Sequence, residues 1–154
     1  MLTLYTPQYQ DLWFRQELLA DPETMSYNHA WGGVIDFSPQ RWPRWYQTWL
    51  CDTEGKRFYR YLMDENRLFV GEIAYRRDEA EDIYMANIIV LSAYRGKGYG
   101  RIGLKLLCDA AKSNGLSALY DDIAIDNPAI GLFSECGFTE QYRTQEIVML
   151  KKQL

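Results

Sequence analysis

The sequence predicts one α/β (α+β) domain, residues 1–154, with a central mixed, mostly antiparallel sheet of six to seven strands and about four helices. Apolar and β-branched runs of strand length recur between turn signals along the chain. From residue 83 onward a strand pattern, a helix pattern and another strand pattern follow one another, which implies one parallel strand pair joined across a helix. Repeats, low-complexity tracts and linkers are absent, so one domain is expected.

The N-terminal third is expected to be mostly helical after a short strand at 2–5. Thr6-Pro7 is typical of an N-cap followed by proline at the first helical position, and it opens a helix to about residue 20. Asp21-Pro22-Glu23 repeats this signal and opens a short second helix. A loop is expected at 28–33, and Ser38-Pro39 opens a third helix that ends near residue 50.

Aromatic side chains are concentrated in this N-terminal segment, because all five tryptophans lie within the first 49 residues. Tryptophans at helical spacing usually pack onto a sheet, so core packing is the simpler interpretation of those in the third helix. The alternative is that the segment forms one wall of a substrate pocket. Loops carry binding residues disproportionately. Tyr27, His29 and Trp31, in the expected loop, are therefore the candidate substrate-binding residues, with core packing as their alternative.

A three-stranded meander is expected in the middle of the chain. The patterns at 57–63 and 68–75 flank a short turn and form a hairpin. An acidic loop at 78–82 leads into the third strand at 83–91, whose apolar end predicts a buried strand.

A glycine-rich turn follows that strand and precedes a helix. Its glycines are Gly96, Gly98 and Gly100. Glycine tolerates positive φ and lets a ligand approach the backbone closely, and the free N–H groups of a first helical turn point at such a ligand. Positive charge comes from Arg95, Lys97 and Arg101, in a protein of net charge −4. A diphosphate is the expected ligand. The P-loop and dinucleotide fingerprints are both absent.

The rest of the chain supplies a helix after the turn, a strand at 119–125, a helix from 129 to about 136, and one or two closing strands. The apolar stripe expected on the first of these helices is Ile102, Leu106 and Ala110, with Gly103 and Leu107 beside it.

Two of these segments resemble signatures of the GNAT superfamily of N-acetyltransferases. Arg95-x-x-Gly98-x-Gly100 resembles the family's acetyl-CoA pyrophosphate loop. The segment from Asp126 to Phe138 resembles a second signature, in which an asparagine precedes a helix closed by Gly-Phe. The resemblance implies the GNAT fold, with a parallel split between the strands that flank the helix after the glycine turn. It also implies acetyl-CoA as donor and direct attack by an amine in a ternary complex.

The resemblance further implies a cofactor site along that split. The main chain at Val90 and Leu91 would pair with the pantetheine arm. Asn127 would contact that arm, with Asp126 as the alternative for the asparagine's position. The pyrophosphate would lie on the segment Arg95, Gly96, Lys97, Gly98, Tyr99, Gly100 and Arg101. Phe133 stands where many members have a tyrosine thought to protonate the leaving thiolate, so this acid is missing or supplied elsewhere, by water or Ser134.

Acetyl transfer also requires a group that takes a proton from the ammonium of the acceptor. A carboxylate whose pKa is raised by burial would serve. The candidates are Glu72 and either Asp121 or Asp122, since adjacent strand residues point to opposite faces and only one aspartate enters the cleft. Glu72 and Asp122 are the catalytic candidates carried forward. An exposed Glu72 or a capping aspartate is the structural alternative.

Composition and charge limit the kinds of partner that are expected for this protein. Net charge −4 argues against nucleic acid, and no apolar run reaches the ~18 residues of a membrane span. The N-terminus lacks the basic region and long apolar core of a signal peptide, so a cytoplasmic protein without a membrane partner is expected. Three widely spaced cysteines and a single histidine match neither a disulfide framework nor a metal site.

The leading functional hypothesis is therefore an acetyl-CoA-dependent N-acetyltransferase that acts on a primary amine of a small molecule or peptide. A non-catalytic acyl-CoA-binding sensor of the same fold is the alternative from another class. A different acyl donor, such as succinyl-CoA, is an alternative within the enzyme class. The sequence leaves the acceptor and the oligomeric state open, a homodimer included.

Overall fold

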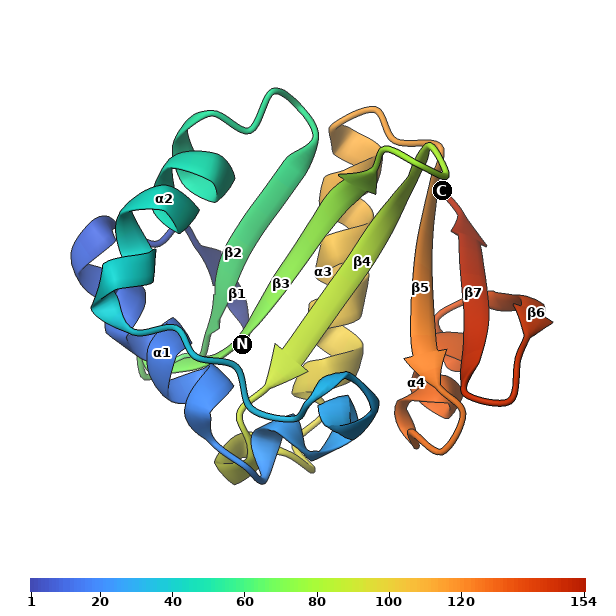
Figure 1. The fold of residues 1–154 in the computed structure, drawn as a ribbon, viewed down its shortest axis with the longest axis horizontal. Helices are drawn as coiled ribbons and strands as arrows, with labels where there is room; N and C mark the ends of the chain where they lie inside the picture. Colours follow the sequence, from blue (N-terminus) through green and yellow to red (C-terminus); the bar gives the residue numbers. More distant parts are fainter.

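The computed structural model describes residues 1–154 and contains one seven-stranded sheet (Figure 1). Its strands are β1 (Thr3–Tyr5), β2 (Arg57–Met63), β3 (Phe69–Asp78), β4 (Ile83–Val90), β5 (Ala118–Ala124), β6 (Thr139–Arg143) and β7 (Ile147–Gln153). Their order across the sheet is β1-β2-β3-β4-β5-β7-β6. Every neighbouring pair is antiparallel except β4 and β5, which are parallel. The predicted fold class is confirmed.

Helical segments cover both faces of this sheet (Figure 1). The α-helices are α1 (Leu12–Ala20), α2 (Trp42–Tyr46), α3 (Tyr99–Ser113) and α4 (Ala129–Glu135). Short 3-10 segments are η1 (Tyr9–Asp11), η2 (Thr24–Trp31), η3 (Pro39–Arg41) and η5 (Ser92–Tyr94), and η4 (Gln47–Cys51) is π-helical. One core lies under α3 and α4, and a second, rich in aromatic side chains, lies under α1 and α2. None of the helices is long and apolar enough to cross a membrane.

The N-terminal helices begin and end differently from the prediction. The first helical residue is Tyr9 rather than Pro7, because Asp11 caps the turn by accepting a hydrogen bond from the backbone N–H of Gln8 at 2.9 Å. The loop predicted at 28–33 is wrong for its first four residues, since η2 continues to Trp31 and ends at Gly32 with φ +104°.

The contact face of α3 is turned relative to the predicted stripe. Its buried residues are Gly103, Leu104, Leu107, Cys108 and Ala111, whereas Ile102 is 42% exposed. The reason is the close approach at Gly103, where an added Cβ would lie 2.9 Å from side-chain atoms of both Ile88 and Leu62. The helix therefore meets the sheet along the line through Gly103, and Ile102 falls outside it.

The parallel pair β4–β5 separates along its length. The two strands are in register at only one position, Met85 opposite Tyr120, and they diverge toward Val90 and Ala124. The strand following β5 in the sheet, β7, is paired with it over its whole length. A parallel split thus opens beside the glycine turn, as predicted.

Candidate active site

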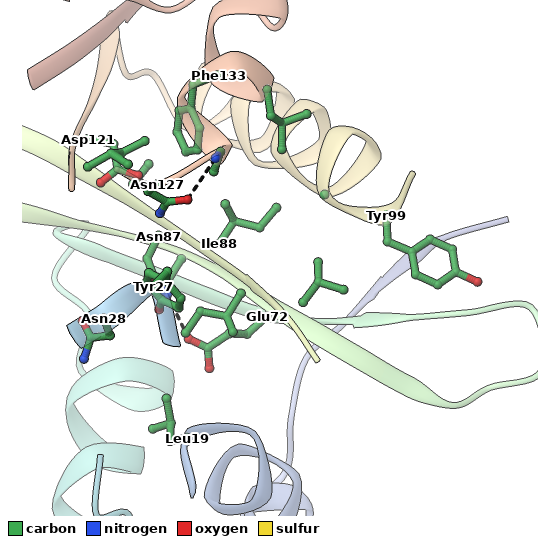
Figure 2. A pocket seen from close by; sticks show the side chains of 18 of the residues that line it. Leu19, Tyr27, Asn28, Glu72, Asn87, Ile88, Tyr99, Asp121, Asn127 and Phe133 are labelled. Atoms are coloured by element: carbon green, nitrogen blue, oxygen red, sulfur yellow. Dashed lines mark hydrogen bonds between the residues drawn. The ribbon is translucent and has the colours of Figure 1, made fainter. Parts of the chain in front are cut away.

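A cleft of about 950 Å³ lies at this split and contains most of the predicted site residues (Figure 2). Those that line it are Tyr27, His29, Trp31, Glu72, Val90, Arg95, Gly96, Gly98, Tyr99, Gly100, Arg101, Asp122, Asn127 and Phe133. Leu91 and Lys97 do not line it. The backbone N–H of Leu91 is already bonded to the carbonyl of Val70 at 2.9 Å.

The glycine turn has a backbone that only glycine adopts easily. Gly96 and Gly98 both have φ +81°, and Gly98 is the N-cap of the 15-residue helix α3. A Cβ at either position would meet no atom within 4 Å, so the turn faces open space. Free N–H groups at the start of α3 are suited to an anionic ligand. These features fit a pyrophosphate group.

The basic side chains of the turn are engaged in different ways. Arg101 pairs with Glu135 of α4 at 2.5 Å, with both side chains exposed. The ammonium of Lys97 lies 5.7 Å from the centre of the Tyr94 ring. Arg95 is bonded to carbonyl oxygens, so its guanidinium anchors the chain besides adding charge.

A polar network joins the turn to the start of η2. Arg95 donates to the carbonyl of Thr24 at 2.8 Å and to that of Glu23 at 3.5 Å. The hydroxyl of Thr24 accepts from the backbone N–H of Ser92 at 2.9 Å, and the Ser92 hydroxyl donates to Asp21 at 2.9 Å. Asp21 also accepts from the Thr24 hydroxyl, and these bonds hold the pKa of its carboxyl below the usual range. We call this network the staple.

The opposite wall of the cleft comes from the start of α4. Asn127 lies two residues before this helix, and its Oδ1 accepts from the N–H of Ala129, the first helical residue, at 2.9 Å (Figure 2). The ring of Phe133 is 2% exposed and packs edge-on against Phe138 with ring centres 5.0 Å apart. Ser134 does not line the cleft. A hydroxyl is therefore lacking on this wall, at the position where the resemblance places the acid.

Glu72 lies at the base of the cleft and is only 2% exposed. Its carboxylate accepts from Arg15 at 2.7 Å, from the hydroxyl of Tyr59, and from Asn87 Nδ2 at 2.9 Å. The guanidinium of Arg15 lies 4.6 Å from the centre of the Trp45 ring. Three donors thus hold the buried carboxylate, and a salt bridge compensates its charge.

The two aspartates of β5 face different surroundings. Both line the cleft, so the prediction that only one aspartate enters it is wrong. Asp121 shares a face of the strand with the buried Leu119 and Ile123, and Asp122, on the other face, is the more exposed of the two. Burial and the charge of Asp122 raise the pKa of Asp121 well above its usual range. Burial also raises the pKa of Asp122, and Arg76 opposes this increase.

The three candidate substrate residues lie on η2 and line the cleft. Tyr27 is half-buried, and Trp31 is 50% exposed at the rim. Between them, His29 Nε2 lies 3.1 Å from Asp126 Oδ2, so that η2 is linked to the loop between β5 and α4. Asp126 therefore contacts η2, whereas Asn127 bonds to the start of α4.

Sequence analysis missed several lining residues. These are Arg15, Asn87, Trp45 and Trp49, although the aromatic segment as a whole was considered as a pocket wall. A polar Asn87 within an apolar strand was a usable signal. No sequence signal indicated Arg15, because its partner Glu72 is 57 residues away in the chain.

The fold and the cleft together define an acyl-CoA-binding type of domain. Its mixed sheet of seven strands is split beside a glycine turn, and a helix start suited to an anion lies at the end of the split. The comparison with family models agrees: residues 6–138 match the model described as the acetyltransferase (GNAT) family. The chain belongs to this family, whose enzymes use acetyl-CoA as donor, and the family resemblance is confirmed.

One relative of stated activity is similar to part of the chain. The chain is 28% identical over 91 residues to a ribosomal protein bS18-alanine N-acetyltransferase from Haemophilus influenzae, covering 59% of this chain and 62% of that protein. The match thus spans less than two thirds of the relative.

Two solved structures share the fold over nearly the whole chain. A spermidine N-acetyltransferase from Vibrio cholerae, in complex with CoA and spermine, is 22% identical with a TM-score of 0.83, covering 99% of this chain and 95% of that one. A putative phosphinothricin N-acetyltransferase is 22% identical with a TM-score of 0.74, covering 100% and 99%. At these identities the likeness concerns the fold.

Proposed function

We propose that this protein transfers the acetyl group of acetyl-CoA to a primary amine of a small molecule or peptide, by direct attack in a ternary complex. The observation that carries the proposal is the single cleft at the β4–β5 split. It is lined both by the glycine turn and by the buried carboxylates. Donor and acceptor groups can therefore meet in one space.

The donor half of the cleft fits acetyl-CoA. Its pyrophosphate would lie against Gly96, Gly98 and the first turn of α3, where free N–H groups and the helix dipole favour negative charge. The pantetheine arm would follow Val90 into the split, with Asn127 on the opposite wall. Acetyl-CoA supplies the activated acetyl group, and the chain binds and orients it.

Direct attack is supported by the positions of the cysteines. Cys51, Cys108 and Cys136 all lie outside the lining of the cleft. Burial raises the pKa of the Cys108 thiol to about 11, which keeps it protonated near neutral pH. An acetyl-cysteine intermediate therefore has no suitable nucleophile here, and the amine is the group that attacks the thioester.

The attacking amine must lose a proton to a carboxylate of the cleft. Glu72 and Asp122 are the candidates carried forward from the sequence, and Asp121 is the alternative to Asp122 that the sequence left open. The carboxylate of Glu72 already accepts hydrogen bonds from three donors, Arg15 among them, so its oxygens are engaged within the chain. Asp121 is the best supported, because its raised pKa lies closer to the working range of a base.

The acceptor half of the cleft lies between η2 and the aromatic side chains of α2 and η4. Tyr27 and Trp31 line one side, and Trp45 and Trp49 line the other. Amines with an apolar or aromatic portion would bury that surface here while the nitrogen reaches the base of the cleft. This supports a small molecule or a peptide end as acceptor.

The test is release of free CoA thiol from acetyl-CoA with a panel of amines. The panel contains spermidine, a peptide that begins with alanine, phosphinothricin, amino acids and arylalkylamines. Turnover with one class is expected, together with a product that is heavier by one acetyl group. Calorimetry with acetyl-CoA alone reports binding independently of the acceptor. Binding without turnover on any amine would instead favour an acyl-CoA sensor. This alternative is tested because Phe133 lacks the hydroxyl that would act as the acid.

A further inference from the structure

Acetyl transfer leaves a thiolate on CoA, and this sulfur must receive a proton before the product departs. Phe133 cannot supply it, and Ser134 on the same helix lies outside the cleft. The donor must therefore come from another wall or from water. Tyr27, Tyr94 and Tyr99 line the cleft with hydroxyls that bond to no other residue, and of these only Tyr27 lies away from the glycine turn and the segments beside it.

Tyr27 lies inside the cleft between the two sides of the split (Figure 2). Its hydroxyl takes part in no hydrogen bond within the chain. The hydroxyls of Tyr59 and Tyr61, in contrast, donate to Glu72 and to the carbonyl of Asp11. Solvent reaches this hydroxyl, so it is available to a ligand in the cleft.

The surroundings of Tyr27 keep its hydroxyl protonated. Burial and then the charges of Glu72 on β3 and Asp121 on β5 raise the pKa of Tyr27. The phenol therefore keeps its proton until a base forms beside it.

Tyr27 is also held at both ends of its segment. The staple fixes residues 21–24 to the glycine turn, with Arg95 to the carbonyl of Thr24 at 2.8 Å as one bond. On the other side, His29 pairs with Asp126 at the entrance of α4. A helix segment that is tied both to the donor turn and to the opposite wall presents its central side chain at a defined place.

We propose that Tyr27 is the catalytic acid of this protein, donating its hydroxyl proton to the CoA sulfur in place of the tyrosine that Phe133 replaces. The proposal rests on the proposed acetyltransferase function. The segment η2 was expected to contact only the acceptor. The proposal gives it a role in the release of CoA from the acetyl group as well.

The proton balance closes with groups of the cleft. The amine nitrogen forms a bond to the acetyl carbon, the C–S bond breaks, and its electron pair stays on sulfur. The proton that the ammonium lost before the attack has by then passed from the carboxylate to solvent. The Tyr27 proton moves to the sulfur, while the second proton lost by the nitrogen passes to Asp121. Once Asp121 is neutral, one charge that raised the pKa of the phenol is gone, so Tyr27 becomes a stronger acid when the sulfur needs it. Proton return from Asp121 to the phenolate restores both groups.

The test compares Tyr27→Phe with the double variant Tyr27→Phe/Phe133→Tyr, using acetyl-CoA and the best amine of the panel. General acid catalysis contributes on the order of 10²–10⁴-fold, so kcat of Tyr27→Phe should fall by at least about 100-fold. The KM of acetyl-CoA should change by less than about threefold, because the lost interaction acts in the transition state. The double variant should regain a substantial part of kcat, since its hydroxyl enters the cleft from the opposite wall.

Tyr142→Phe, on the exposed edge strand β6, is the matched control and should keep the activity of the unmodified protein. Calorimetry with acetyl-CoA and the melting temperature check that Tyr27→Phe is folded. Equal turnover of Tyr27→Phe and the unmodified protein at all pH values would overturn the proposal. So would a loss of acetyl-CoA binding in place of a loss of kcat, which would mark Tyr27 as structural. Absence of turnover by the unmodified protein on every amine would instead contradict the proposed function itself.

Discussion

Replacing Gly98 by aspartate should abolish tight binding of acetyl-CoA while costing little more stability than the same change at the other end of the helix. Gly98 opens α3 with φ +81°, and Gly115 follows the end of α3 with φ +89°. A Cβ at either position meets no atom within 4 Å. Both variants therefore have the same cause of instability, a left-handed backbone, at roughly 1–2 kcal/mol. Only Gly98 lines the cleft.

The loss of affinity follows from the charge. A carboxylate placed about 4 Å from a phosphate oxygen repels it by roughly 1–4 kcal/mol, depending on the effective dielectric constant. This corresponds to a decrease of about 5- to 900-fold in affinity. Gly98→Ala carries the strain without the charge, and it should lose less than Gly98→Asp.

Calorimetric titration of acetyl-CoA into Gly98→Asp, Gly98→Ala and Gly115→Asp measures these effects, and thermal unfolding measures the strain. We expect Gly115→Asp to bind acetyl-CoA as the unmodified protein does. Unchanged affinity in Gly98→Asp, with the protein folded, would refute the assignment of the pyrophosphate to this turn. Equal losses in the two aspartate variants would show that strain, and not proximity to the ligand, is the cause.

Three further predictions concern the carboxylates and the cysteines. Glu72→Gln leaves the charge of Arg15 buried without its partner and should lower the free energy of unfolding by roughly 3–5 kcal/mol. Glu140→Gln removes a solvent-exposed ion pair and should cost far less. Urea denaturation compares the two variants, and equal costs would contradict the buried ion pair. Folding raises the pKa of Asp121, so the folded state binds more protons and this residue reduces stability as pH rises above about 4. Asp121→Asn should therefore raise the melting temperature at pH 7 and make the melting temperature depend less on pH. An unchanged dependence of the melting temperature on pH would contradict the burial of this carboxyl. Alkylation of the exposed Cys51 should leave turnover unchanged, since direct attack uses no thiol, and inactivation that acetyl-CoA prevents would argue for an acetyl-cysteine.

The middle of the chain could be predicted from sequence because its signals are local. Strand β4, the glycine turn and α3 follow one another directly, and each is marked by residues within a few positions of its own ends. The contact face of α3 could not be predicted in the same way. It depends on Gly103 meeting Leu62 and Ile88, and hydrophobic periodicity alone does not report where a sheet approaches most closely.

The candidate site shows the same division. The glycine turn and Asn127 belong to local motifs, and they line the cleft as expected. The bonds of Arg95 to the carbonyls of Glu23 and Thr24 span more than 70 residues, and nothing in a basic residue beside glycines indicates them. The surroundings of Glu72 likewise depend on Arg15 from a distant helix. Contacts of this kind arise from tertiary packing and have no sequence spacing to detect.

In the proposed ternary complex, the staple would link the donor half of the cleft to the acceptor half. Any ligand that draws the Arg95 guanidinium toward itself competes with the carbonyl of Thr24, and any ligand that orders η2 strengthens that bond. The free energies of donor and acceptor binding are then not independent. By thermodynamic linkage, whatever factor acetyl-CoA imposes on the affinity for the amine, the amine imposes on the affinity for acetyl-CoA.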